Sequence, residues 1–372
     1  MKRFFKGIFR GIRWGCLVVA AIVCVGCGSD SRDGQNGTIQ RIDSAMGTVI
    51  TQKIYVDNEY DTEHASAKGD SESNASCEKG EKIAEDIMRK ITDLEQNLLS
   101  WRLESSELYT INANAGQEEG IILSAELAEI LKKCLEVSEA SEGAFDITVG
   151  EVVRLWDIDS WAGIGDTSEY ELPNREDIAE KLEKTGYEKL ILQERLLCLP
   201  PEMQIDLGAV GKGIALDCLK KYLTEQEDVT GAVISVGGSI LTYGEKSDGA
   251  PWRVAVVNPS DSTKQLGYLE LDGQWCVSTS GDYERYVEVD GVRYHHIIDP
   301  FTGYPADSGL RGVTVLTEEG WLSDALSTAC FLLGWEKGQT LAESYGAEAL
   351  AVDWDGNVFM TEGMESYFHL YD

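Results

Sequence analysis

The stretch Asp206-Leu-Gly-Ala-Val-Gly-Lys-Gly213 stands at the centre of the pattern that decides the fold, because a helix is predicted directly after it, over 214–223. Strands are expected over three apolar stretches: 231–243, 252–258 and 312–316. Upstream, helical spacing of apolar residues covers 83–98 and 127–135, and 190–199 suggests a short hairpin. Ser124 is a possible cap of the second of those helices. This mixture of elements, without a repeat, predicts an α+β fold.

The glycines of the same stretch allow a close approach of the backbone, and Lys212 adds a positive charge just before a helix. Such a segment can hold phosphate groups at the helix N-terminus. It has neither the G-x-x-x-x-G-K-[ST] spacing of a P-loop nor the G-x-G-x-x-G fingerprint of a dinucleotide site. A tight turn between a strand and a helix is the structural alternative.

Two further motifs have plain structural interpretations when taken alone. Ser141-Glu-Gly-Ala-Phe-Asp-Ile-Thr-Val-Gly150 follows a predicted helix and indicates a helix stop with a turn. Ile234-Ser-Val-Gly-Gly-Ser239 places two glycines at the end of an apolar strand, where bulges and turns are common.

The histidines give a sharper indication of chemistry. The chain has only four, and His295 and His296 stand together shortly before an Asp-Pro turn, in Tyr294-His-His-Ile-Ile-Asp-Pro300. The stretch Thr279-Ser-Gly-Asp-Tyr-Glu-Arg285 precedes them. A lone histidine is more often structural than catalytic, but their rarity and a neighbouring carboxylate favour acid–base chemistry.

A metal site is indicated by Ser323-Asp-Ala-Leu-Ser-Thr-Ala329, on a predicted helix that Gly334 can end. Asp324 and Thr328 are four residues apart, so both oxygens project from one face of that helix. A carboxylate and a hydroxyl so placed can hold a hard cation, with water and phosphate oxygens completing the octahedron. Alternatively, Asp324 is an acid of the first turn that the helix dipole favours.

The N-terminus has the order of an export signal. Five basic residues precede an apolar run over 14–25, which ends in Gly26 and Cys27. The run is shorter than the roughly 20 residues that span a bilayer, and it resembles a bacterial lipoprotein signal with Cys27 as the acylated first mature residue. An uncleaved signal anchor is the alternative. We therefore expect a signal over 1–27, a flexible tether over 28–40 and one domain over 41–372 with an acidic surface insertion over 57–80.

Charge and cysteine usage narrow the function further. The formal net charge is -33, and removing the first 27 residues leaves 27 basic against 65 acidic side chains, which disfavours a nucleic-acid partner. The cysteines after the signal are expected to be small core residues rather than a disulfide framework or a zinc site. They are Cys77, Cys134, Cys198, Cys218, Cys276 and Cys330.

Together these motifs, from Ala45-Met-Gly-Thr48 to about Gly334, resemble the ApbE family of FAD:protein FMN transferases, bacterial lipoproteins and periplasmic proteins that flavinylate redox subunits. The resemblance implies an ApbE-like, T-fold-related domain of mixed sheet and helices with FAD in a central cleft. It also implies Mg²⁺-dependent transfer of FMN from FAD to a Thr or Ser hydroxyl of an acceptor redox protein, with release of AMP. The expected location is extracytoplasmic, lipid-anchored to the cell membrane. Two alternatives stay open: an FAD pyrophosphatase that yields FMN and AMP, and a non-catalytic FAD-binding lipoprotein.

The resemblance also assigns residues. His296 is expected to activate the acceptor hydroxyl, and Ser327 stands where many members have a second acid. The implied metal ligands are the Ala209 carbonyl, Asp324 and Thr328. The implied FAD contacts are Met46, Trp101, Ala144, Phe145, Asp146, Asp206, Lys212 and Ile298.

Overall fold

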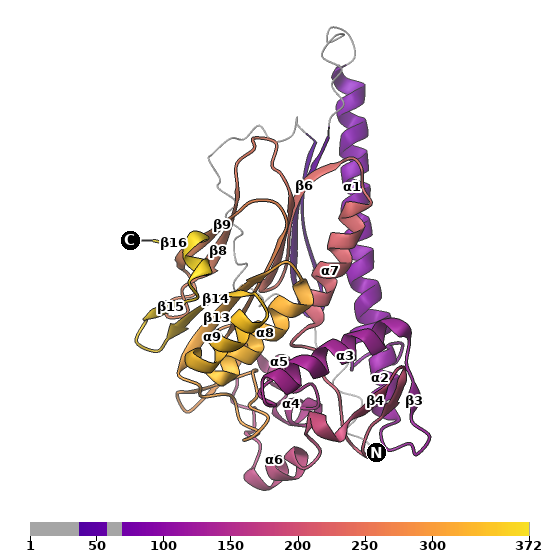
Figure 1. Cartoon of the computed structure of the whole chain (residues 1–372), viewed down its shortest axis with the longest axis vertical. Helices are drawn as coiled ribbons and strands as arrows, with labels where there is room; N and C mark the ends of the chain where they lie inside the picture. The colour runs from indigo at the N-terminus through magenta and orange to yellow at the C-terminus, as the bar shows by residue number, and fades with distance from the viewer. Residues whose placement is uncertain (1–36, 58–68, 372) are drawn as a thin grey trace.

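A computed structural model describes residues 37–57 and 69–371 of the chain (Figure 1). The predicted signal, with Cys27, and residues 28–36 of the predicted tether lie outside the described residues. The first strand, β1, begins at Thr38. The last three residues of the predicted tether therefore belong to the folded domain.

The largest element is a sheet of eight antiparallel strands in the order β1-β2-β6-β7-β10-β13-β14-β15. Its strands are β1 (Thr38–Ala45), β2 (Thr48–Val56), β6 (Val229–Val236), β7 (Ser239–Gly244), β10 (Trp275–Gly281), β13 (Leu310–Thr317), β14 (Glu348–Asp353) and β15 (Val358–Met360). The predicted single strand over 231–243 is in fact β6 and β7, because Gly237 and Gly238 make a two-residue turn between Val236 and Ser239. Gly237 has a positive φ of 61°, which such a turn needs.

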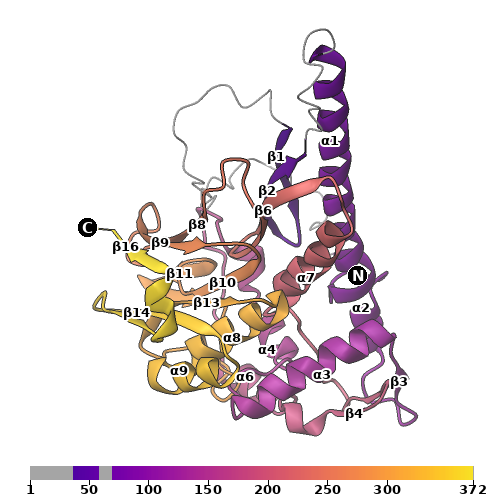
Figure 2. The same cartoon turned by 45° about the horizontal axis from the view of Figure 1, so that its top comes forward.

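Both faces of this sheet are buried, as the alternation of side chains along its strands shows. On β6, Ile234 packs into the main core, whereas its neighbour Val233 packs into a second cluster on the opposite face. Helices cover the first face, and a small sheet covers the second (Figures 1 and 2). The strands of that small sheet are β8 (Trp252–Val257), β9 (Gln265–Leu271) and β16 (Phe368–Leu370).

The long helix α1 (Gly69–Leu94) continues into a π-helical turn, η2 (Glu95–Leu99). Residues 69–80 of the predicted surface insertion are helical and belong to α1. The apolar spacing begins only at Ile83, just after Gly80, where the helix comes against β1. A Cβ on Gly80 would lie 2.4 Å from the Ile39 side chain.

Most of the other predicted helices, and the predicted hairpin, are present in the structure. Ser124 caps α3 by accepting the Leu127 amide at 3.1 Å, and the hairpin of 190–199 is present as β4 and β5. The elements are α2 (Glu107–Ala113), α3 (Ala125–Ala140), α4 (Gly150–Trp156), α5 (Ile158–Trp161), α6 (Arg175–Leu182), α7 (Gly211–Thr224), α8 (Gly320–Leu333), α9 (Trp335–Ser344), η3 (Tyr187–Lys189), η4 (Gly363–Ser366), β3 (Ile121–Ile122), β4 (Ile191–Gln193) and β5 (Leu196–Cys198).

A small third core lies apart from the main one and supports the histidine pair. It joins helices α4 to α6 to the hairpin of β11 (Tyr286–Val289) and β12 (Val292–His295). Trp156 stacks on Tyr294 at a centroid distance of 5.6 Å and donates its indole N–H to the Gly303 carbonyl at 2.7 Å. This core fixes the direction in which the chain leaves β12 toward His296.

The structure also shows the state of the cysteines and whether any helix could cross a membrane. All six cysteines of the described residues are free thiols, and Cys134, Cys276 and Cys330 are buried as expected. Cys77 is exposed on α1, so the expectation of a core position is wrong for that residue. Within 37–57 and 69–371, none of the helices is both long and apolar enough to cross a membrane.

Candidate active site

The N-terminal ends of α7 and α8 cross at two glycines. A Cβ on Gly213 would lie 2.0 Å from the Gly320 carbonyl oxygen, and a Cβ on Gly320 would lie 2.3 Å from the Gly213 carbonyl oxygen. Any larger residue at either position would push the helices apart. The glycine-rich stretch therefore serves the packing of two helices as well as the turn before α7.

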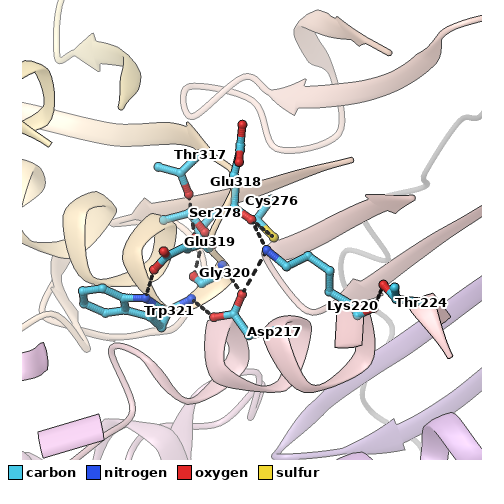
Figure 3. Close-up of polar contacts among 11 residues, drawn as sticks. Asp217, Lys220, Thr224, Cys276, Ser278, Thr317, Glu318, Glu319, Gly320 and Trp321 are labelled. Carbon is cyan, nitrogen blue, oxygen red and sulfur yellow. Dashed lines mark hydrogen bonds and ion pairs between the residues drawn. The ribbon is translucent and has the colours of Figure 1, made fainter. Parts of the chain in front are cut away.

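Each of these helices caps the other with a carboxylate. Asp217 of α7 accepts the backbone amides of Gly320 and Trp321, both at 2.8 Å (Figure 3). Asp324 of α8 accepts the Gly213 amide at 2.7 Å. The first amides of a helix lack partners within the helix and carry its positive dipole end, so both contacts are stabilising. The crossing is thereby fixed without a ligand.

Asp324 has further partners that Asp217 lacks. Its Oδ1 accepts the Ser239 hydroxyl at 2.5 Å, and its Oδ2 lies 3.8 Å from the Lys212 Nζ. The residue is only 3% exposed. The interpretation of Asp324 as an acid that serves the dipole of its own helix is wrong, because its carboxylate reaches the start of α7 instead.

The other oxygen groups expected at the metal come from α8 and from the turn before α7. Thr328 Oγ1 lies 3.2 Å from the Ser280 hydroxyl, and the Ser327 hydroxyl donates to the Asp324 carbonyl at 2.9 Å. Ala209 lies in the turn immediately before α7. In the described part of the chain, no three His, Cys, Asp or Glu side chains gather as a metal site. The available donors are thus one carboxylate, a hydroxyl and a carbonyl, a set that fits a hard cation such as Mg²⁺ completed by water or phosphate oxygens.

Met46 reaches the same helix end from the edge of the large sheet. Ala45 pairs with Thr48, so Met46 and Gly47 form a two-residue turn, and Met46 has a φ of 52°. A non-glycine residue in this region is strained and is often found at functional sites. The turn is held by the Met46 amide, which donates to Glu95 at 2.9 Å. The Met46 methyl group would lie 3.4 Å from a Cβ on Gly211, so the side chain lies over the start of α7.

The two neighbouring histidines have different roles in the structure. His295 is buried, with its Nε2 2.9 Å from the Ala306 carbonyl and its Nδ1 accepting the Ile297 amide at 3.3 Å. Both of its ring nitrogens are therefore occupied. His296 has its Nδ1 3.2 Å from the Arg285 carbonyl, which also accepts the His296 backbone amide at 3.1 Å.

The contact with Arg285 determines the tautomer of His296. A carbonyl oxygen only accepts, so the proton of the neutral ring lies on Nδ1 and Nε2 carries the lone pair. Burial lowers the pKa of His296, and the positive charges of Arg285 and Lys212 lower it further. The ring is therefore neutral near pH 7.

Comparison with known proteins gives this arrangement a context. A model of the ApbE family matches residues 46–351. The chain belongs to the ApbE family. The relatives include the FAD:protein FMN transferase of Treponema pallidum, 28% identical over 95% of this chain and 96% of that one. The Escherichia coli K12 protein of the same name is 33% identical over 72% of this chain and 76% of that one.

Solved ApbE structures confirm the α+β fold. The ApbE protein of Thermotoga maritima superposes with a TM-score of 0.74 at 30% identity, covering 89% of this chain and 99% of that one. The flavinyl transferase ApbE of Pseudomonas stutzeri, in its apo form, gives 0.71 at 29% identity, over 91% and 99%.

Four of the FAD contacts that the ApbE resemblance implies have side chains occupied within the fold. Ala144, Phe145 and Ile298 are 4%, 2% and 6% exposed. Asp146 accepts the amide and hydroxyl of Thr148 at 2.7 and 2.6 Å and the Tyr187 amide at 2.9 Å. Contacts with FAD at these positions stay a prediction for their backbone groups.

The other implied contacts are polar or partly exposed. Asp206 accepts the Gly208 amide at 2.6 Å, which closes the turn before α7, and burial raises the pKa of its carboxyl group. The Trp101 ring has the guanidinium groups of Arg102 and Arg154 at 4.0 and 4.5 Å from its centroid. A flavin that stacks on a face covered by either group has to displace it.

One residue near the ApbE site was not found from the sequence. Asp159, on the short helix α5, lies 3.2 Å from Arg102 and 3.0 Å from Arg285. It therefore connects the segment of Trp101 with the segment of His296. No motif signals this residue, because its partners are 57 and 126 positions away in the sequence.

Proposed function

We propose that this chain is an FAD:protein FMN transferase that attaches FMN, taken from FAD, to a Thr or Ser hydroxyl of an acceptor protein. The observation that carries the proposal is a neutral histidine, His296, whose Nδ1 is held by the Arg285 carbonyl so that Nε2 carries the lone pair. Family membership supports the activity, because the relatives from Treponema pallidum and Escherichia coli are named for it.

The reaction begins with a proton that the acceptor hydroxyl has to lose. Nε2 of His296 takes this proton while the hydroxyl oxygen attacks the FMN phosphorus of FAD. A new phosphorus–oxygen bond forms to the acceptor, and the bond between that phosphorus and the bridging oxygen of the diphosphate breaks. AMP leaves with the bridging oxygen and its electron pair, and the proton passes from His296 to solvent.

Negative charge develops on the diphosphate during this step. Lys212 and the amides at the start of α7 are positioned to stabilise it. Asp324, Thr328 and the Ala209 carbonyl would hold Mg²⁺ beside Lys212, and that ion would supply charge neutralisation on the phosphate oxygens. The hydroxyls of Ser239 and Ser280 orient the first two of these ligands.

Water can replace the acceptor at the same phosphorus, in which case the products are FMN and AMP. Incubation with FAD and Mg²⁺, with and without an acceptor peptide that contains Thr and Ser, separates the activities. Covalent flavin on the peptide supports transfer. Equal AMP formation with and without the peptide, with no flavin on the peptide, indicates a pyrophosphatase. FAD binding with no AMP formation indicates a binding protein.

We also propose that the chain acts outside the cytoplasm, held to the membrane by lipid on Cys27. The order of basic residues, apolar run and cysteine supports this. The acceptor would then be a membrane-bound or extracytoplasmic redox subunit. Cys27→Ser should release the protein from the membrane fraction or leave an uncleaved precursor. Unchanged fractionation, with no mass shift from lipid in the wild type, would contradict the anchor.

A further inference from the structure

Asp159 lies between the two segments that the site brings together. Its two carboxylate oxygens have separate partners: Oδ1 lies 3.0 Å from Arg285, and Oδ2 lies 3.2 Å from Arg102. The Asp159 side chain is 29% exposed, so water screens these pairs only in part. A single carboxylate therefore holds two guanidinium groups that come from distant parts of the chain.

Arg285 is the link from Asp159 to the histidine. Its carbonyl oxygen faces both the backbone amide and the Nδ1 of His296, at 3.1 and 3.2 Å. Arg285 directly precedes β11, and His296 directly follows β12, so the hairpin brings both residues to its open end. Fixing the Arg285 side chain restrains the same residue whose carbonyl selects the tautomer of His296.

We propose that Asp159 is a positioning residue of the transferase site. It acts through Arg285 to keep the Nδ1–H tautomer of His296, and through Arg102 to hold the chain segment that carries Trp101. This role rests on the proposed function, because it assigns Asp159 to the base of that reaction. The residue does not itself contact the acceptor hydroxyl or the phosphorus.

The charges around Asp159 agree with this role. Burial opposes the ionised form of Asp159, but the charges of Arg285 and Arg102 outweigh it and hold the pKa of the carboxyl group below its ordinary value. Around His296, Asp159 is the negative charge that counters Arg285 and Lys212. Removing the carboxylate would leave both guanidinium groups without this ion-pair partner, and that of Arg285 acts on the His296 ring.

The chain offers a matched control two residues away. Asp157 lies at the junction of α4 and α5 and accepts the Ser160 hydroxyl at 2.7 Å. Asp157→Asn makes the same chemical change as Asp159→Asn without touching either guanidinium group. Asn also tolerates the positive φ of 45° at this position.

The first test measures the tautomer of His296 in the full chain by ¹⁵N NMR of the imidazole near pH 7, with the signals assigned through His296→Asn. The wild type and Asp157→Asn should show the Nδ1–H tautomer alone, and Asp159→Asn should show a mixture. Asp159→Glu keeps the charge, so most molecules of this variant should again have the Nδ1–H tautomer. A single Nδ1–H tautomer in folded Asp159→Asn would overturn the proposal.

The second test measures AMP release from saturating FAD with Mg²⁺ and the acceptor peptide. Asp159→Asn should lower turnover about tenfold, an effect of the size of one charge-assisted hydrogen bond, and should lower it no further when His296→Asn is already present. An additional tenfold loss in that double variant would overturn the proposal. If the wild type releases no AMP, the proposed function fails, and the NMR result still decides the role of Asp159.

Discussion

The two walls of the site are built in different ways. The wall of α7 and α8 is held by hydrogen bonds from backbone amides to carboxylates, buried at Asp324 and half-buried at Asp217, and by the contact of two glycines. The wall that carries His296 is held by ion pairs of partly exposed side chains, Arg102, Asp159 and Arg285. In the proposed reaction the first wall holds phosphate and metal, and the second supplies the base. The first wall depends on backbone contacts, whereas the second also depends on charges that a single substitution can remove.

The largest expected effect comes from Asp324→Ala on the first wall. The change removes a metal ligand and the partner of Lys212, so turnover should fall about a thousandfold, in line with several kcal/mol of charge stabilisation in the transition state. The dependence on Mg²⁺ concentration should weaken as well. Activity at the wild-type level in low Mg²⁺ would move the metal site elsewhere. Thr328→Ala should be milder, because it removes a neutral ligand.

On the second wall, His296→Asn should lower turnover roughly a hundredfold and leave FAD affinity nearly intact, because a general base acts in the transition state. FAD affinity from flavin fluorescence and the rate from AMP release separate the two. Weak FAD binding with a normal rate at saturation would make His296 a binding residue. His295→Asn is the control, and it should affect stability more than rate, since both ring nitrogens of His295 are occupied by backbone groups.

The pH dependence of His296 follows from its environment. Burial and the charges of Arg285 and Lys212 lower the pKa of the ring. The active, neutral form therefore persists below the ordinary histidine value of about 6.5. In the pH profile of kcat/KM of the wild type, the midpoint of the acid limb should therefore lie below a pH of about 6.5. An acid limb above pH 7 would contradict a buried neutral base.

Lys212→Ala tests how much the first wall contributes to the affinity for FAD. A cation beside the diphosphate contributes to the bound state as well as to the reaction, so FAD affinity should fall about tenfold or more. Equilibrium binding without Mg²⁺ isolates the lysine from the metal. An unchanged affinity there would show that Lys212 acts only on the leaving group or only as a partner of Asp324.

The smallest effect on activity is expected from Asp217→Ala, the structural counterpart of Asp324. The change leaves the amides of Gly320 and Trp321 without their cap, so the free energy of unfolding should fall by about 1–2 kcal/mol. Turnover of the folded protein should change by less than about threefold. Denaturant unfolding and AMP release measure the two quantities. A loss of turnover as large as that of Asp324→Ala would mean that the crossing, rather than the ligand set, limits the reaction.

The first wall was largely predictable from the sequence because its key groups lie in short motifs. Asp324 and Thr328 share α8, and Lys212 lies in the first turn of α7. The reciprocal caps were not predictable, since Asp217 and Gly320 are 103 positions apart. The second wall was predicted only at His296, because its supports are ion pairs between distant segments. Helix α1 was predicted too short, since its first turns are polar and carry no apolar spacing.

The most direct test of the account is transfer to a protein acceptor. The full chain, with its own signal, is co-expressed with the redox subunits whose genes adjoin its own, and covalent flavin is detected by fluorescence in denaturing gels and by mass spectrometry. We predict a mass gain of one FMN on a Thr or Ser of one subunit, absent with Asp324→Ala and strongly reduced with His296→Asn. Flavin-free subunits, together with AMP release from FAD that needs no acceptor, would contradict transfer and make the protein a hydrolase.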